Sequence, residues 1–163
     1  MKVMVINSGS SSVKYETFDA SDFSVHSSGL LERIGEEESR HVHRVYEPSG
    51  KVHELVRKGR VADHEDGFRF LLSLPPEAAA IKSPSEVMGI GHRVVHGGEA
   101  FREPTLVDDA VLEKIRDLIP LAPLHNPANL LGIEAARRVF PEAPQVAVFD
   151  TAFHQSMPPH AFT

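Results

Sequence analysis

The N-terminal part of the chain alternates between short apolar runs and turn-forming residues, which is typical of strands joined by tight connections. Residues 3–6 predict a buried strand that is followed by the polar stretch 7–12. In residues 13–17, apolar side chains alternate with Lys and Glu, so a second strand is expected there. Together these segments predict a β-hairpin with a small polar tip. A third strand is expected over residues 23–31.

The middle of the chain predicts a second hairpin and two short helices. Residues 42–46 and 52–56 flank a Pro-Ser-Gly turn, and this hairpin is expected to project from the core. A helix is expected to begin at Asp63, whose carboxylate can cap the backbone amide near Asp66. The helix ends before two consecutive prolines, and the alanine-rich stretch after them favours a further short helix.

The second half of the chain alternates strands with helices. Residues 87–95 predict a strand interrupted by two glycines, and a helix with one apolar face starts at Asp108 or Asp109. A further helix over 126–139 opens with an asparagine as N-cap and a proline at the first helical position. Residues 146–149 predict a buried strand. Strands first, then alternating helices and strands, indicate an α/β domain with a mixed sheet.

Composition narrows the classes of function. A chain of 163 residues is long enough for one domain with one core. The net charge of -6 disfavours non-specific binding to nucleic acid or to anionic membranes, which both rely on clustered Lys and Arg. The absence of cysteine excludes disulfides, thiolate zinc sites and cysteine nucleophiles, and it fits a cytoplasmic protein. The apolar run near the N-terminus is too short for a signal peptide, and no stretch is long enough to span a membrane.

The tip of the first hairpin is the first segment that could carry chemistry. Residues 7–14 offer backbone N–H groups and serine hydroxyls to an anion, and Lys14 adds a positive charge. The segment lacks the spacing of a P-loop, and no helix is expected after it. An alternative is a serine-rich turn in which Asn7 and Ser12 hydrogen-bond their own backbone.

Two charged residues in the second half are further candidates. Arg93 lies among apolar residues of a predicted strand, and burying it requires an anionic partner. That partner is either a bound carboxylate or phosphate, which a guanidinium can grip bidentately, or an acidic side chain of the protein. Asp150 follows a buried strand, where α/β sheets place ligands, although it could simply cap the next helix.

Histidines invite two further hypotheses. The proline-bounded loop 121–125 presents His125 just before a helix, either to a ligand or only to the loop itself. His41 and His43 share one face of a predicted strand. No HExxH motif and no cysteine supports a zinc site, so a histidine-based zinc site is not expected.

Four stretches, read together, point to a family. In chain order they are VINSGSSSVKY, GHRVVHGGE, LAPLHNPANLLGI and VAVFDTAFHQSMP. They closely resemble the successive signature stretches of the acetate kinase family, and the resemblance runs from Met1 to about Pro158. It implies a ribonuclease H-like α/β fold, a mixed sheet flanked by helices, as in the superfamily of acetate and sugar kinases, Hsp70 and actin. Residues 1–163 would then be the first of two duplicated domains, without the second.

The resemblance also implies an activity. Members of the family transfer the γ-phosphoryl group of ATP reversibly to acetate, giving acetyl phosphate and ADP, with Mg²⁺ as cofactor. On this basis Asn7 would help to place the magnesium ion. Lys14, with Ser10 and Ser12 nearby, would face the ATP phosphates.

The same resemblance assigns the acetate site. Arg93 would hold the carboxylate of acetate or the phosphate of acetyl phosphate, and Val95 and Leu124 would wall the pocket for the methyl group. Asp150 would be the catalytic carboxylate. The implied partners are acetate and ATP, with no nucleic acid and no membrane, and the full-length protein would be a homodimer formed through the missing C-terminal domain.

Three alternatives remain open at this point. A kinase for propionate or butyrate would share the same motifs, because one methylene group changes binding by only ~1–3 kcal/mol. A non-catalytic nucleotide-binding module of the Hsp70 or actin kind would not need Arg93 at a carboxylate site. A mere folding domain would bind nothing. Since family members carry further phosphate and adenosine contacts in their second half, the chain by itself is expected not to turn over.

Overall fold

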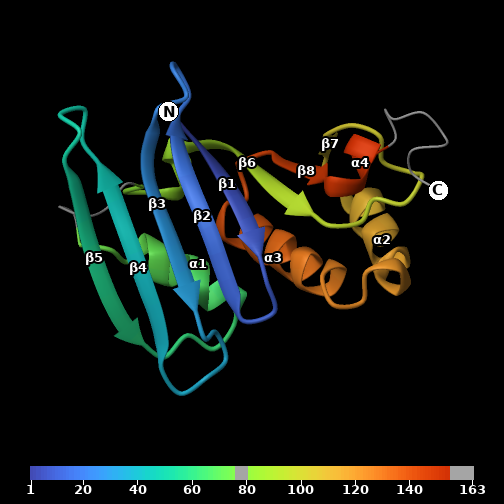
Figure 1. Ribbon diagram of the computed structural model, residues 1–163, viewed down its shortest axis with the longest axis horizontal. Coiled ribbons are helices and arrows are strands. Elements are labelled where there is room, and N and C mark those ends of the chain that lie inside the picture. Colours follow the sequence, from blue (N-terminus) through green and yellow to red (C-terminus); the bar gives the residue numbers. More distant parts are fainter. Residues whose placement is uncertain (76–80, 155–163) are drawn as a thin grey trace.

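A computed structural model describes residues 1–75 and 81–154 (Figure 1). The strands are β1 Lys2–Ser8, β2 Ser12–Asp19, β3 Val25–Glu32, β4 Ser39–Tyr46, β5 Val52–Gly59, β6 Val87–Val94, β7 Thr105–Leu106 and β8 Gln145–Phe149. The α-helices are α1 His64–Leu72, α2 Asp109–Asp117, α3 Asn126–Val139 and α4 Asp150–His154. Short 3₁₀ helices span Pro84–Glu86 and Ile119–Leu121.

The described strands form one mixed sheet in the order β5-β4-β3-β2-β1-β6-β8-β7. From β5 to β1, neighbouring strands are antiparallel. On the other side of β1, strands β6 and β8 run parallel to it, and β7 closes the edge antiparallel to β8. The expected α/β architecture with a mixed sheet is confirmed, and the parallel strands β1, β6 and β8 place their carboxyl ends at one edge of the sheet.

Both predicted hairpins form, and the position of the second differs from the expectation. The first is confirmed, with β1 and β2 paired from Lys2 opposite Asp19 to Ser8 opposite Val13. The second, β4 and β5, forms as predicted but does not project from the core, because β4 pairs with β3 and extends the same sheet. Pairing in this way satisfies the backbone groups that an edge strand β3 would leave exposed.

The ends of the helices follow the capping rules in two cases. The Asp63 carboxylate accepts a hydrogen bond of 2.9 Å from the backbone N–H of Asp66, and α1 follows directly. The Asp108 carboxylate accepts one of 2.8 Å from the N–H of Val111 at the start of α2. Both predicted starts are confirmed. The helix expected in the alanine-rich stretch lies at 76–80, outside the described residues.

The start of α3 corrects the sequence-based prediction. Asn126 is the first residue of the helix rather than its N-cap, and His125 occupies the cap position without a side-chain hydrogen bond. The Asn126 side chain is fully buried and turns to the loop after β6, where it bonds both the N–H and the carbonyl oxygen of His96. The Asn126 side chain therefore bonds the distant His96 backbone instead of capping the helix.

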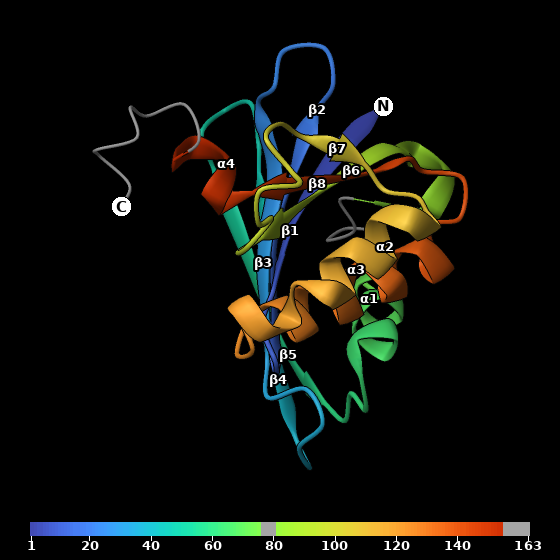
Figure 2. The ribbon, with the colours of Figure 1, turned by 90° about the vertical axis from the view of Figure 1, so that its right-hand side faces the viewer.

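The core lies between the sheet and helices α1, α2 and α3, which all cover the same face (Figure 2). One apolar cluster packs the centre of the sheet against α1 and α3; its most buried members include Met4, Ile6, Leu31, Phe68, Ile90 and Phe140. A second cluster packs β6 and β8 against α2 and α3, among them Val94, Ile115, Ile133 and Phe149. None of these three helices covers the opposite face, where Val5, Met88 and Val148 are 44–46% exposed.

A polar group is buried within this core, beneath α1. The Tyr15 hydroxyl lies 3.0 Å from His41 Nε2 and 2.6 Å from His43 Nδ1. Since a hydroxyl has one hydrogen to donate, it can donate to only one of the two imidazoles, and at least one ring must donate to it. Gly29 leaves room for the Tyr15 ring, because a Cβ there would lie 2.3 Å from it. Burial, and then the neighbouring charge of His43, lowers the pKa of His41 to about 4.

Candidate active site

The register of the central strands brings three candidate residues into one row. Asn7 on β1 pairs with Lys14 on β2, so their side chains share a face of the sheet. On the other side of β1, Ile6 pairs with His92 on β6, and the next residues, Asn7 and Arg93, are therefore neighbours. Asn7, Lys14 and Arg93 all lie on the face that α1, α2 and α3 leave uncovered. The row crosses three adjacent strands near the carboxyl ends of β1 and β6.

Asp150 joins the row through Arg93. Arg93 pairs with Val148 on β8, and Asp150 follows two residues later, as the first residue of α4. Nε of Arg93 donates to both carboxylate oxygens of Asp150, at 3.0 and 3.1 Å, and Nη2 donates to Oδ2 at 2.7 Å. Of the two partners considered for Arg93, the structure contains the internal one, and that partner is itself a candidate catalytic residue.

The Arg93–Asp150 pair is open to solvent. The two side chains are 50% and 38% exposed, and an ion pair of this kind adds little to folding stability. The hydrogen bonds that Arg93 donates to Asp150 raise the pKa of Arg93, which is charged at every accessible pH in any case. A guanidinium that is fixed, charged and reachable from solvent is suited to bind a small carboxylate or phosphate.

The hairpin tip next to Asn7 is a tight turn that is hydrogen-bonded to the start of α1. The N–H of Gly9 donates to the carbonyl of Ser12 at 2.8 Å, which closes the turn. The Gly9 carbonyl in turn accepts a hydrogen bond of 2.8 Å from Nε2 of His64, a buried residue at the start of α1. A side chain at Gly9 would crowd the hydroxyl of Ser12, since its Cβ would lie 2.9 Å from Oγ. Ser10 sits exposed at the end of this tip.

The residues expected to wall a methyl pocket lie on two loops. Val95 is half-buried directly after β6, and Leu124 is 82% exposed on the loop before α3. Their joint role stays a prediction. His125, next to Leu124, is also exposed.

Residues 1–75 and 81–154 contain no cluster of three or more His, Cys, Asp or Glu side chains that could hold a metal ion. No helix in the same ranges is both long enough and apolar enough to cross a membrane.

Sequence reasoning missed the contribution of Asn129. Its amide is buried on α3, where Nδ2 donates to the Ser8 carbonyl at 2.9 Å and Oδ1 accepts from the N–H of Val95 at 3.1 Å. It thus contacts the ends of both β1 and β6. The available signal was the spacing from Asn126, because residues three apart on a largely apolar helix share a face and two amides there need tertiary partners.

Comparison with known proteins places this arrangement in a family. The model of the acetokinase family matches residues 2–163. The chain belongs to the acetokinase family. A curated acetate kinase of Syntrophobacter fumaroxidans is 55% identical over 163 residues, and one of Thermotoga maritima is 49% identical over 164 residues. In both comparisons the match covers 99% of this chain but 40% of the relative, so the chain spans about two fifths of their length.

Solved structures of acetokinase relatives agree with the fold. An acetate kinase of Porphyromonas gingivalis superposes with a TM-score of 0.86 at 40% identity, covering 98% of this chain and 39% of that one. A propionate kinase of Francisella tularensis gives 0.83 at 39% identity with the same coverage. The expected fold is therefore confirmed: a mixed sheet with flanking helices that matches part of longer acetate and propionate kinases.

Proposed function

We propose that this chain forms the acetate-binding half of the active site of an acetate kinase. In the full-length protein it would transfer the γ-phosphoryl group of ATP reversibly to acetate, giving acetyl phosphate and ADP. The observation that carries the proposal is the row of Lys14, Asn7 and Arg93, with Asp150 bonded to Arg93, on one open face of the sheet. Membership of the acetokinase family supports it.

In this proposal Arg93 binds the carboxylate of acetate, or the phosphate of acetyl phosphate in the reverse direction. Acetate is already ionised at neutral pH, so no general base is needed to activate it. Asp150 is therefore assigned to orienting Arg93 and other groups at the reacting centre rather than to removing a proton. Val95 and Leu124 are assigned to the wall of the methyl pocket.

Lys14, Ser10 and Ser12 are assigned to the phosphates of ATP. Phosphoryl transfer depends mainly on in-line positioning and on neutralising charge that spreads over the moving group. Lys14 lies beside Asn7 in the row, and the serines belong to the tight tip that continues it. Positive charge from Lys14 and Arg93 would flank the transferred group from two strands.

Magnesium fits the donor types found here. Mg²⁺ prefers oxygen ligands and is usually held by one or two side chains, waters and substrate phosphates. The amide of Asn7 supplies such an oxygen, so this side chain would help to place the ion, and the carboxylate of Asp150 on the same face of the sheet would orient a water bound to it. When bound, it would neutralise charge on the phosphates. Acetate and ATP as substrates, a cytoplasmic location and a homodimer formed by the remaining part of the protein belong to the same proposal.

The test is the formation of acetyl phosphate, trapped as its hydroxamate, by the full-length protein and by residues 1–163 alone. We expect activity that needs ATP, acetate and magnesium in the full-length protein and none above the buffer blank in the fragment. A full-length protein that binds ATP but makes no acetyl phosphate would favour a nucleotide-binding module instead.

Propionate is a second candidate substrate, because the propionate kinase of Francisella tularensis superposes almost as well as the acetate kinase. A ratio of kcat/KM for acetate and propionate, measured in the full-length protein, decides between them. One methylene group in an apolar pocket is worth ~1–3 kcal/mol, so the preferred acid should win by about tenfold or more.

A further inference from the structure

Asn129 occupies the junction between the two strands that carry the proposed site. The pairing of β1 with β6 runs as far as Ile6 and His92. Beyond that point the Asn129 amide lies between the strand ends, donating to the Ser8 carbonyl at 2.9 Å and accepting from the N–H of Val95 at 3.1 Å. The side-chain amide thus takes the place that a peptide group would occupy between two strands.

Both contacts fix the orientation of this amide. A backbone carbonyl can only accept and a backbone N–H can only donate, so Nδ2 must face Ser8 and Oδ1 must face Val95. Asn129 is 4% exposed, and breaking either bond would leave a buried backbone group without its partner. Aspartate keeps the acceptor but loses the donor, and alanine loses both.

A second contact, independent of the amide, holds the same strand end against α3. Gly132 lies one helical turn after Asn129, and a Cβ at this position would lie 2.0 Å from Oγ and 2.5 Å from Cβ of Ser8. The end of β1 therefore rests directly on the helix, with no room for movement towards it. On the β6 side, Asn126 bonds the backbone of His96 from the preceding turn of the helix.

We propose that Asn129 is a positioning residue for phosphoryl transfer. Ser8 directly follows Asn7, and Val95 lies two residues after Arg93, so the amide sets the spacing between the phosphate-facing hairpin tip and the anion-binding guanidinium. The proposal rests on the proposed function of these residues. Asn129 lies on the helix-covered side of the sheet, yet it would set the distance between the groups that bind substrate on the open face.

This role has a specific kinetic signature. In-line transfer is sensitive to geometry, and a displacement of about 1 Å can cost ~10²-fold in rate. A change in spacing leaves the side chains of Lys14 and Arg93 in place to bind their substrates, so kcat should fall by a larger factor than the KM values for acetate and ATP rise. A variant that is only less stable would contain less active enzyme, but in its folded molecules the strand ends would keep their positions.

The test compares Asn129→Ala and Asn129→Asp with Gln145→Ala in the full-length protein. Gln145 is a matched control, because its buried amide also bonds two groups, the His92 ring and the Ala143 carbonyl, at the opposite end of β8 from Asp150. At temperatures where all variants are folded, we expect kcat to fall by about 10- to 100-fold in both Asn129 variants. Gln145→Ala should lose stability but keep its kcat. A kcat that is equal in the Asn129 and Gln145 variants would overturn the proposal.

Hydrogen exchange supplies a readout that does not depend on turnover. The Val95 amide, and the tip residues that follow Ser8, should exchange faster in Asn129→Ala than in Gln145→Ala at matched overall stability. If the wild-type protein made no acetyl phosphate, the proposed function would fail while the exchange result would still decide whether Asn129 holds the two strand ends. Unchanged exchange at Val95 would count against the positioning role, whatever the activity.

Discussion

Arg93 donates three hydrogen bonds to Asp150: Nε reaches Oδ1 at 3.0 Å and Oδ2 at 3.1 Å, and Nη2 reaches Oδ2 at 2.7 Å. The contact is set by the sheet, because Arg93 pairs in register with Val148 and Asp150 follows on the same face. An acetate ion that binds Arg93 must therefore share the guanidinium with a carboxylate that is already in place. The charge of Asp150 should therefore affect directly how Arg93 binds acetate and stabilises the transition state.

Replacing Asp150 by asparagine tests whether this charge contributes to catalysis. The substitution keeps the size of the side chain but removes the charge that orients Arg93, so transition-state stabilisation should be lost. In the full-length protein we expect kcat to fall by about 10²-fold or more, as for the loss of one preorganised electrostatic group. Initial rates of acetyl phosphate formation measure it, and a near-normal kcat would remove Asp150 from the catalytic role.

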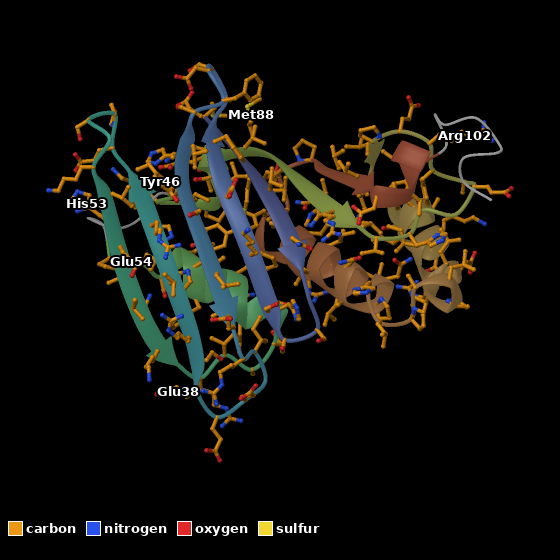
Figure 3. The ribbon with its side chains drawn as sticks, viewed as in Figure 1. Glu38, Tyr46, His53, Glu54, Met88 and Arg102 are labelled. Atoms are coloured by element: carbon orange, nitrogen blue, oxygen red, sulfur yellow. The ribbon has the colours of Figure 1, made fainter. Side chains whose placement is uncertain are left out.

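Arg93→Ala should raise the KM for acetate and lower kcat/KM by ~10²-fold or more, because a charge-assisted bidentate contact is lost. Arg44→Ala is the matched control. Arg44 makes a comparable exposed ion pair with Glu54, at 2.7 Å, on strands β4 and β5 far along the sheet from β8 (Figure 3). Steady-state kinetics on both variants decide, and equal effects would mean that Arg93 has no special part in substrate binding.

Acid should destabilise the fold through two buried histidines. Burial lowers the pKa of both His41 and His92 to about 4, below the ordinary value near 6.5 of the unfolded chain. As the pH falls from about 6.5 towards 4, the unfolded state takes up protons that the folded state does not, so stability is lost within this window and is unaffected above it. The upper limit is about 3 kcal/mol for each histidine.

Urea unfolding at several pH values between 7 and 4.5 measures this loss. His41→Gln should flatten the dependence by removing one of the two groups; its Nδ1 is buried and has no hydrogen-bond partner within residues 1–75 and 81–154, so protonation there is costly. An unfolding midpoint independent of pH in the wild type would contradict the prediction.

Ser8→Ala should stabilise the protein. The Ser8 hydroxyl oxygen is buried without a hydrogen-bond partner in the described part of the chain, at the point where β1 meets Gly132. Removing an unsatisfied buried polar group gains about 1 kcal/mol. Ser27→Ala is the contrasting variant, because the Ser27 hydroxyl lies 2.7 Å from that of Thr17 and its loss should cost stability. Denaturant midpoints that move in the same direction for both would disprove the distinction.

Much of the local structure could be predicted because it depends on neighbouring residues. Alternation in residues 13–17 indicates β2, and Asp63 and Asp108 mark the starts of α1 and α2 through hydrogen bonds within a few residues. The prediction failed where the partner was distant. Asn126 has the sequence pattern of an N-cap, yet its side chain bonds His96 across the fold, and the second hairpin joins a sheet whose edge no local pattern reveals.

By itself the sequence determined which segments become strands and helices, and the order of four motifs indicated the family, because both are encoded along the chain. Only the tertiary structure decided that Lys14, Asn7 and Arg93 stand in one row, that Asp150 is the partner of Arg93, and that Asn129 joins Ser8 to Val95. These relationships depend on strand register. A shift of one residue between β1 and β6 would leave the strand propensity of each segment satisfied but would put Arg93 on the opposite face from Asn7 and Lys14.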